Sequence, residues 1–280
     1  MSRRFLFVDV FSEQAFSGNP LPVILDGEGL STEEMQKITR WMNLSETVFL
    51  LPPTDSMADY RVRIFTLDRE MPFAGHPTLG SCHAWLASGG QPQGEIEIIQ
   101  ECGVGLVPIR RTNTNLAFAA PELIRSGSVD ESKLREITRA LRIKRDDIVD
   151  ARWADNGPGW VAVLLESAQA VLDLEPFSDF PTRLDIGVVG PYEDGEDAAF
   201  ELRALYTDQH GAIREDPVTG SLNASVAQWL LASGRATAPY VAKQGACLGR
   251  AGRIEISQDD EGTVWVGGCT RTMVEGKVVI

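Results

Sequence analysis

The chain of 280 residues lacks the markers of several specialised protein classes. It has only 4 cysteines and 3 histidines, and no two cysteines are spaced as Cys-x-x-Cys. Disulfide-rich secreted domains need more cysteines than this, and zinc sites need closely spaced cysteine or histidine ligands. We therefore expect reduced thiols and no bound metal.

Long hydrophobic runs are also missing. No apolar stretch approaches the ~20 residues that cross a bilayer, so the sequence predicts no membrane-spanning helix. Residues 1–9 begin with the basic start of a signal peptide, but Asp9 interrupts the apolar stretch and no small-residue cleavage site follows. These features predict a cytoplasmic protein without a membrane partner.

Positive charge is scarce as well. Lys and Arg total 26 against 40 for Asp and Glu, which gives a formal net charge of -14. No basic tract offsets this excess, so the average surface repels a polyanion. We therefore expect no nucleic-acid partner.

What the chain does contain is an internal repeat. Residues 70–89 and 215–234 are identical at seven of twenty positions, at a constant offset of 145. Three flanking pairs of segments also match: 35–42 with 134–141, 60–65 with 200–205, and 94–98 with 252–256. Four segments that recur in the same order indicate an ancient duplication of one α/β unit.

The repeated segments predict the elements of each copy. Capping signals at residues 31–34 and 128–131 predict the starts of two amphipathic helices. The helices expected over 78–87 and 222–232 carry no Lys, Arg, Asp or Glu, and a helix without a charged face is buried on all sides. The remaining segments alternate apolar and polar residues, which predicts antiparallel or mixed sheets.

We therefore predict an α+β fold of two pseudo-symmetric domains, each a mixed or antiparallel sheet rolled around a central buried helix. The first domain is expected over residues 1–115 and the second over 116–272, with the boundary near 113–121. The last strand, 273–280, is expected to return to the first domain.

The starts of the two buried helices are the candidate binding site. A helix N-terminus offers unpaired N–H groups and about half a positive charge, which suits a small anion. Gly75 and Gly220 remove a side chain there, so the backbone could approach a ligand closely. Alternatively, these glycines only let a buried helix pack against a strand. Two such starts that face each other would form one carboxylate-binding cleft between the domains.

Polar side chains near these helix starts are the candidate reactive groups. His76 could donate to a carboxylate or move a proton, or it could merely cap its helix. Asp216, with Thr219 and Ser221 nearby, could bind a substrate ammonium group or could also serve as a cap. Glu46 lies where a helix gives way to an apolar strand, so burial would raise its pKa toward the range of a general acid/base; an exposed strand start is the alternative.

Longer motifs add a resemblance. They are VDVF (8–11), FSGNP (16–20), NLSETVF (43–49), FAGHPTLG (73–80) and EDPVTGS (215–221). In this order, over essentially the whole chain, they resemble the phenazine-biosynthesis PhzF-like family. The resemblance implies the diaminopimelate epimerase-like fold, with the active site between two similar domains. It also implies a cofactor-independent isomerase that moves a proton between carbons, and a homodimer.

The family's functional residues fall on named positions of this chain. The resemblance assigns the general acid/base to Glu46 and the assisting histidine to His76, beside Gly75. It assigns the aspartate and serine of the second helix start to Asp216 and Ser221.

Two departures shape the expected chemistry. Amino-acid epimerases and proline racemases of this fold use one cysteine at each helix start, whereas here the nearest thiol, Cys82, lies inside a helix. A two-thiol racemase is therefore not expected. After Ser221 the chain reads Leu222-Asn223, a pattern of a family branch without an assigned reaction, and Asn223 could face the ligand.

The leading hypothesis is an isomerase of a small carboxylate, with Glu46, His76 and Asp216 as catalytic residues. The substrate-binding residues would be Gly75, Gly220, Ser221, Thr219 and Asn223. Two alternatives stay open: a non-catalytic carboxylate-binding protein of the same fold, and an epimerase that uses carboxylates and histidine in place of thiols.

Overall fold

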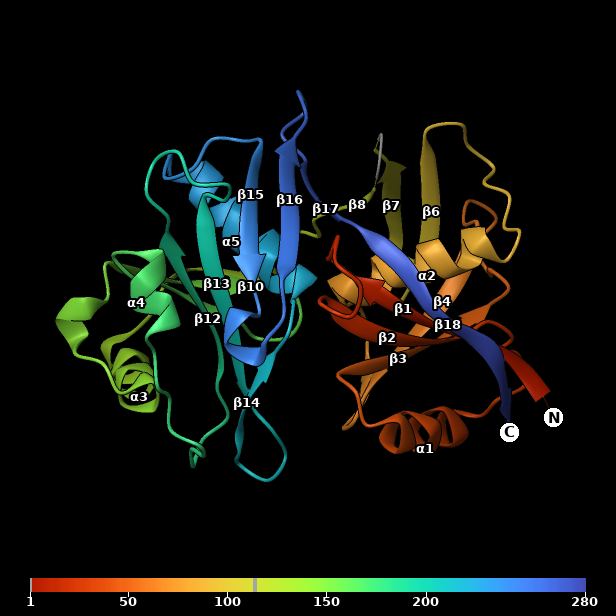
Figure 1. Ribbon diagram of the computed structural model, residues 1–280, viewed down its shortest axis with the longest axis horizontal. Helices are drawn as coiled ribbons and strands as arrows, with labels where there is room; N and C mark the ends of the chain where they lie inside the picture. Colours follow the sequence, from red (N-terminus) through yellow and green to blue (C-terminus); the bar gives the residue numbers. More distant parts are fainter. Residues whose placement is uncertain (1, 113–114) are drawn as a thin grey trace. The chain divides into compact units, whose positions relative to one another are not determined.

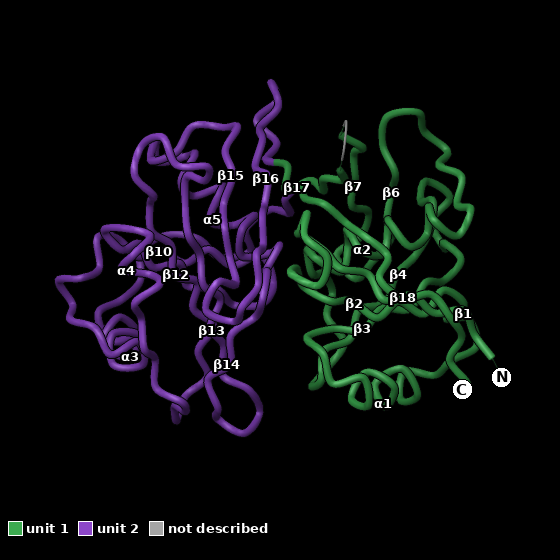
Figure 2. The backbone as a smooth tube through the Cα atoms, in the orientation of Figure 1, with its two compact units in different colours: residues 1–119, 265–280 green, residues 120–264 purple. Residues whose placement is uncertain are grey.

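The computed structural model describes residues 2–112 and 115–280, which divide into two units (Figures 1 and 2). Unit 1 comprises Met1–Ala119 and Trp265–Ile280, and unit 2 comprises Ala120–Val264. The boundaries lie at 119/120 and 264/265, whereas those expected from the sequence are 115/116 and 272/273. Of the expected boundary region, residues 113 and 114 lie outside the described residues.

Strand pairing explains the shifted boundaries. Strand β8 (Leu116–Ala119) pairs with β7 (Gly105–Arg111) and with β17 (Val264–Gly268), so β8 and nearly all of β17 complete the sheet of unit 1. Strand β18 (Thr270–Val279) then pairs antiparallel with β1 (Ser2–Val10). The final strand thus joins the first strand of the chain, and the returning segment begins at residue 265.

The sheet of unit 1 runs in the order β18–β1–β2–β3–β4–β6–β7–β8–β17, with β5 paired to β4. Its other strands are β2 (Asn19–Ile24), β3 (Glu46–Leu51), β4 (Tyr60–Thr66), β5 (Glu70–Met71) and β6 (Glu97–Cys102). The pairs β2–β3 and β4–β6 are parallel and the others antiparallel. Helix α2 (Gly75–Ala87) contacts strands all along this sheet, from β18 and β1 to β8, so the sheet surrounds the helix (Figure 1).

In its described residues, unit 2 repeats the strand pairing of unit 1 from β18 to β7, without counterparts of β8 and β17. Its sheet runs β9–β10–β11–β12–β13–β15–β16, with β14 paired to β13. Again two pairs are parallel, β11–β12 and β13–β15. The strands are β9 (Arg125–Ser128), β10 (Asp150–Asp155), β11 (Val161–Leu164), β12 (Asp185–Pro191), β13 (Phe200–Thr207), β14 (Ile213–Asp216), β15 (Tyr240–Gln244) and β16 (Gly252–Gln258). Helix α5 (Gly220–Ala232) contacts β10 and β16 and is the counterpart of α2.

The two central helices have the burial that their composition predicts. Neither has an acidic residue in its first turn or a basic one in its last, and nine residues of α2 and ten of α5 are buried. Helix α2 lies so close to strand β2 that a Cβ added at Gly80 would be 2.4 Å from a methyl carbon of Leu21. The expected α+β fold, with a sheet around a buried helix in each copy, is confirmed.

The outer helices differ from the sequence match in one respect. Helix α1 (Thr32–Met42) begins at the expected capping box of Ser31 and Glu34. Helix α3 (Glu131–Leu141) is capped by Asp130, whereas Ser128 belongs to β9. The expected capping box over 128–131 is therefore wrong, because the strand extends to Ser128 and the chain turns into the helix two residues later.

These two helices cover equivalent strands through different connections. Helix α1 packs on residues of β2, β3 and β4, and α3 packs on residues of β11, β12 and β13. In unit 1, α1 connects the parallel pair β2–β3, whereas in unit 2 the short helix α4 (Ala168–Leu172) connects the parallel pair β11–β12. The matched apolar stripes therefore reflect a shared packing site and not a shared place in the topology.

A second expected match does not follow the topology either. Residues 252–256 lie in β16, which pairs antiparallel with the first strand after α5. Its counterpart in unit 1 is β7, whereas residues 94–98 lead into β6. Both segments alternate in hydrophobicity, and alternation identifies a half-buried strand without saying which one.

Among the described residues, no helix is both long and apolar enough to cross a membrane.

Candidate active site

The start of α2 gathers three of the polar side chains in unit 1. Gly75 is the first helical residue, and the extended Ala74 before it provides no side-chain cap. His76, the second residue, is 2% exposed. Its Nδ1 lies 3.6 Å from Glu46 Oε2 and 3.3 Å from the amide nitrogen of Asn19. Three separate segments of the chain therefore meet at this ring.

The environment of His76 keeps its ring neutral. Burial lowers the pKa of His76 from 6.5 to about 3, because the imidazolium form would lose its hydration. The Glu46 contact is too long for a hydrogen bond, so it is a close approach of a carboxylate to a neutral ring and not an ion pair. A neutral imidazole has one donor and one acceptor nitrogen, and its neighbours decide which is which.

Glu46 is held at the edge between water and the apolar core. It is the first residue of β3, opposite Thr66 of β4, and its side chain is 16% exposed. The strand that follows is buried from Thr47 to Leu50. A carboxylate in this position is anchored by the sheet and remains partly accessible, which a group that exchanges protons with a substrate requires.

Asn19 is fixed by the connection between β1 and β2. The carboxylate of Asp9 accepts hydrogen bonds from the backbone N–H of Ser17, at 3.1 Å, and of Gly18, at 3.0 Å. Gly18 is required here, because a Cβ would lie 2.2 Å from the carbonyl oxygen of Val10. The tight loop delivers Asn19, which is 1% exposed, to the histidine ring.

The start of α5 is built as a network of hydrogen bonds. The Thr219 hydroxyl donates to Asp216 Oδ2 at 2.6 Å, and the Thr219 N–H donates to Gln244 Oε1 at 3.0 Å. The Gln244 amide nitrogen in turn donates to the Asp216 carbonyl and to the Thr219 hydroxyl, both at 3.0 Å. Gln244 comes from β15, so one side chain joins this strand to the helix start.

Asn223 belongs to the same network. Its amide nitrogen donates to the Thr219 carbonyl at 3.0 Å and to Gln244 Oε1 at 2.9 Å, and the residue is 2% exposed. Thr78 is its counterpart in unit 1: it donates to the Ala74 carbonyl and accepts from Gln100. In both units the fourth helical residue thus ties the helix start to a glutamine of the next strand.

Ser221 stands where unit 1 has His76, at the offset of 145. Its hydroxyl accepts a hydrogen bond from the Trp160 indole nitrogen at 3.3 Å, and its carbonyl accepts one from the Asn156 amide at 2.9 Å. All three residues are buried. Gly220 precedes Ser221 as the first residue of α5, and Thr219 provides no side-chain cap.

The sequence-predicted residues thus form two groups. Glu46, His76 and Gly75 meet in unit 1, and the second group, in unit 2, consists of Asp216, Thr219, Gly220, Ser221 and Asn223. Sequence reasoning missed Asn19, Trp160 and Gln244 as neighbours of these residues. Asn19 lies in the quoted FSGNP motif, which was a signal for it, whereas no pattern marks Trp160.

The thiol nearest along the chain to the start of α2 or α5 is that of Cys82. Cys82 lies in the middle of α2 and is fully buried, and burial raises the pKa of its thiol to about 12. A thiol with such a pKa is not an acid/base at neutral pH. The Cys82 thiol is therefore unsuited to proton transfer at the start of α2.

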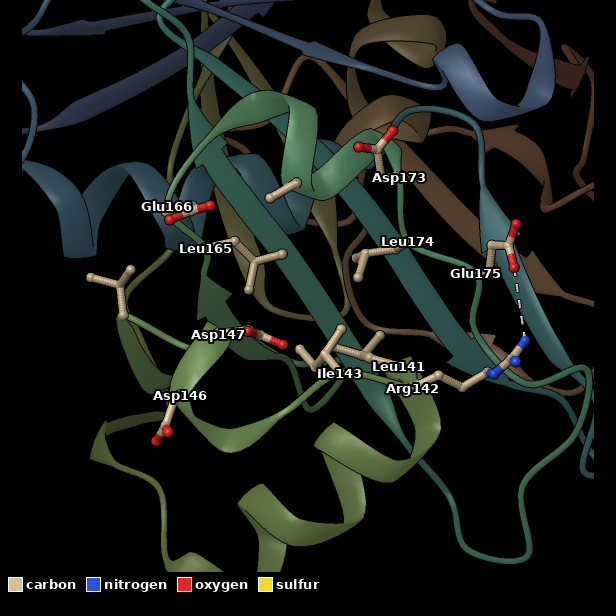
Figure 3. Close-up of a pocket in the computed structure, with 12 residues that line it drawn as sticks. Leu141, Arg142, Ile143, Asp146, Asp147, Leu165, Glu166, Asp173, Leu174 and Glu175 are labelled. Carbon is tan, nitrogen blue, oxygen red and sulfur yellow. Dashed lines mark ion pairs between the residues drawn. The ribbon is translucent and has the colours of Figure 1, made fainter.

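Hollows elsewhere in the units have a different character. A cavity of about 480 Å³ lies in unit 2 between the end of α3 and α4. Figure 3 shows the residues that line it. Its lining includes five acidic residues and one arginine, Arg142, which lies 3.9 Å from Glu175. A hollow of about 530 Å³ in unit 1 surrounds the other end of α2, at Trp85 to Gly90. Neither includes a residue of the two helix starts, and the acidic one would repel a carboxylate.

Comparison with known proteins identifies relatives over the whole chain. The family model described as "Phenazine biosynthesis-like protein" matches residues 8–279. Antisense-enhancing sequence 1 of Schizosaccharomyces pombe is 36% identical, covering 99% of this chain and 98% of the relative. An uncharacterised isomerase of Pasteurella multocida is 31% identical over 93% of this chain and 89% of its own. The trans-2,3-dihydro-3-hydroxyanthranilate isomerase of Pseudomonas aeruginosa is 35% identical over 64% of each chain.

Solved structures show the same fold. A phenazine biosynthesis protein of the PhzF family from Bacillus anthracis superimposes with a TM-score of 0.81, at 22% identity and full coverage of both chains. A probable proline racemase from Agrobacterium radiobacter, solved with bound carbonate, gives a TM-score of 0.61 at 14% identity over 99% of this chain and 93% of its own. These likenesses confirm the diaminopimelate epimerase-like fold.

Proposed function

The chain belongs to the phenazine biosynthesis-like protein family and is an isomerase, and from this premise we propose its reaction: a proton shift between two carbons of a small unsaturated carboxylate. The observation that carries the proposal is the approach of Glu46 to His76 at the start of α2. It supplies a partly accessible carboxylate beside a neutral, buried imidazole.

The proposed step is an allylic proton transfer. The Glu46 carboxylate takes a proton from a saturated ring or chain carbon, the C–H electron pair forms a new double bond to the neighbouring carbon, and the original π electron pair shifts to the far carbon. The protonated Glu46, whose side chain is partly exposed, exchanges its proton with water and then gives a proton to the far end of the conjugated system. Bonds and electrons balance without an oxidant or reductant, and the product is a constitutional isomer of the substrate.

Charge developing on the substrate would be stabilised by the helix starts. The N-terminal amides at Gly75 and Gly220 have no side-chain cap, and helix N-termini favour an anion. We propose that both bind the same ligand in a cleft between the units, with Ser221 and Thr219 beside the second. Asp216, tied to Thr219, would orient a polar group of the substrate.

Asn223 takes a supporting place in this proposal. Its side chain is engaged by the Thr219 carbonyl and by Gln244, so it would shape the helix start and not contact the ligand. This assignment differs from the expectation that Asn223 faces the substrate. The homodimer expected from the family remains part of the proposal.

The test is incorporation of solvent deuterium into substrate carbons. The compounds are a panel of unsaturated carboxylates that includes trans-2,3-dihydro-3-hydroxyanthranilate, the compound in the name of the Pseudomonas relatives. Glu46→Gln keeps the shape of the side chain and removes its basicity, so exchange should fall by about 10² to 10⁴-fold. Glu95→Gln, the same change at an exposed position, is the matched control. Equal exchange by Glu46→Gln and the unchanged protein would remove Glu46 from its role.

A further inference from the structure

The second residues of the two central helices share an arrangement that extends the proposed function. His76 and Ser221 occupy equivalent positions, and both are buried. Each is contacted by a donor group from another segment: His76 by the Asn19 amide and Ser221 by the Trp160 indole. The chemistry of these donors decides what His76 and Ser221 can do.

Asn19 selects the tautomer of His76. The Asn19 amide nitrogen lies 3.3 Å from Nδ1 and can only donate, so Nδ1 must be the acceptor of this bond. In a neutral ring the proton then resides on Nε2. This nitrogen is buried, and none of the described residues accepts a hydrogen bond from it. A buried donor without a protein acceptor is costly, and such groups occur where a ligand supplies the acceptor.

Trp160 orients the Ser221 hydroxyl in a comparable way. An indole N–H is a donor only, so the Ser221 oxygen is the acceptor in the 3.3 Å contact. The hydroxyl proton must point away from the indole. Ser221 is thereby prepared to donate to a further group.

Both donors come from the same place in the repeat. Asn19 follows the connection between β1 and β2, and Trp160 ends the connection between β10 and β11. These strands are counterparts in the two sheets. The duplicated unit therefore carries a duplicated device, in which a strand connection fixes the side chain after the first glycine of the central helix.

We propose that Asn19 and Trp160 are positioning residues that hold His76 and Ser221 as hydrogen-bond donors toward the anionic group of the substrate. This inference rests on the proposed function and deepens it. Neither positioning residue needs to touch the substrate, because each acts through the side chain that it contacts.

The first test concerns the histidine and needs no substrate. Nitrogen-15 NMR of the full chain distinguishes protonated from unprotonated ring nitrogens, and with 3 histidines the signals can be assigned by substitution. Above the titration of His76 its Nδ1 should be unprotonated and its Nε2 protonated. A proton on Nδ1 would overturn the assignment. Asn19→Asp replaces the donor with an acceptor and should move the proton to Nδ1, and an unmoved proton would also count against it.

The second test concerns the serine. Trp160→Phe removes the indole N–H and keeps an aromatic ring, and deuterium exchange into trans-2,3-dihydro-3-hydroxyanthranilate should fall by about 10-fold. Trp229→Phe is the matched control: this tryptophan is also buried in unit 2, and its indole nitrogen has no hydrogen-bond partner among the described residues. It should leave exchange unchanged.

A combined variant separates positioning from a general loss of packing. In a Ser221→Ala background Trp160→Phe should have no further effect, because the hydroxyl that it orients is gone. An equal loss in both backgrounds would show that Trp160 only packs and would overturn its role. Failure of the proposed function has a different signature: no exchange by the unchanged protein with any compound, while the NMR result still decides the His76 tautomer.

Discussion

The starts of α2 and α5 occupy equivalent positions in the two units, yet their polar side chains are arranged differently. At α5, Asp216, Thr219 and Gln244 satisfy one another in a continuous set of hydrogen bonds. At α2, the equivalent region holds a neutral histidine whose Nε2 has no acceptor among the described residues. In the proposed reaction, this hydrogen-bonded set in unit 2 would hold the substrate, whereas Glu46 and His76 of unit 1 would take part in proton transfer.

A second pair of equivalent residues differs in the same sense. Arg63 of β4 forms a bidentate ion pair with Glu70, and Arg203 of β13 forms one with Glu215. The side chains are 25% and 38% exposed in unit 1 but 7% and 8% exposed in unit 2. Arg203 also donates to two backbone carbonyls at the end of α4. The same pair is thus a surface contact in one unit and a buried structural element in the other.

The largest expected effect on stability comes from comparing the same substitution, glutamate to glutamine, at the equivalent positions of the two units. Glu215→Gln leaves the buried Arg203 charge without its carboxylate and should lower the free energy of unfolding by about 3 kcal/mol or more. Glu70→Gln, the matched change in unit 1, should cost less than about 1 kcal/mol because water solvates Arg63. Urea unfolding of both variants measures the difference, and equal losses would contradict the comparison.

An intermediate effect is expected for His76→Ser, which gives unit 1 the residue that unit 2 has at the equivalent position, Ser221. Burial lowers the pKa of His76 from 6.5 to about 3, so between these values the unfolded chain binds a proton that the folded chain does not. Stability should therefore rise with pH across this window, by up to about 1.4 kcal/mol per pH unit for this group, and fall as the pH drops toward about 3.

His76→Ser removes this contribution. The variant should be less stable at neutral pH because of the cavity, but its stability should depend less on pH over the same window. The measurement is urea unfolding at a series of pH values, with His210→Ser, which removes an exposed histidine, as the control. An unchanged slope for His76→Ser would show that the ring titrates in the folded protein as it does in the unfolded chain.

The smallest effect is expected for Asn223→Thr, which gives unit 2 the residue that unit 1 has at the equivalent position, Thr78. Asn223→Thr can keep the bond to the Thr219 carbonyl, as Thr78 does with Ala74, but it loses the donor to Gln244 Oε1. The cost in thermal unfolding should be about 1 kcal/mol. Asn223→Ala loses both bonds and should cost more, and a smaller loss for alanine than for threonine would contradict this account.

The fold could be predicted largely from local pattern. Charge-free segments identified the central helices, because burial of a helix on all sides excludes charged residues wherever the strands lie. The offset of 145 between the matched segments identified the repeat. The matched stripes of α1 and α3 did not reveal that α4 makes the crossover in unit 2. A stripe records which face is buried and carries no information about the connection that delivers the helix.

The sequence by itself determined that two buried helices follow Gly75 and Gly220, and it placed His76, Asp216 and Ser221 beside these glycines, since they are neighbours along the chain. The helices were expected from residues 78 and 222, whereas in the structure they begin at Gly75 and Gly220 themselves. The residues alone left Glu46 open between a general acid/base and an exposed strand start, and the motif resemblance favoured the general acid/base. Only the tertiary structure decided which distant side chains act on this set. Asn19 and His76 are 57 residues apart, Trp160 and Ser221 are 61 apart, and Gln244 and Thr219 are 25 apart. Such contacts depend on strand register and on the course of tight loops, and the physical chemistry of a single segment does not specify either.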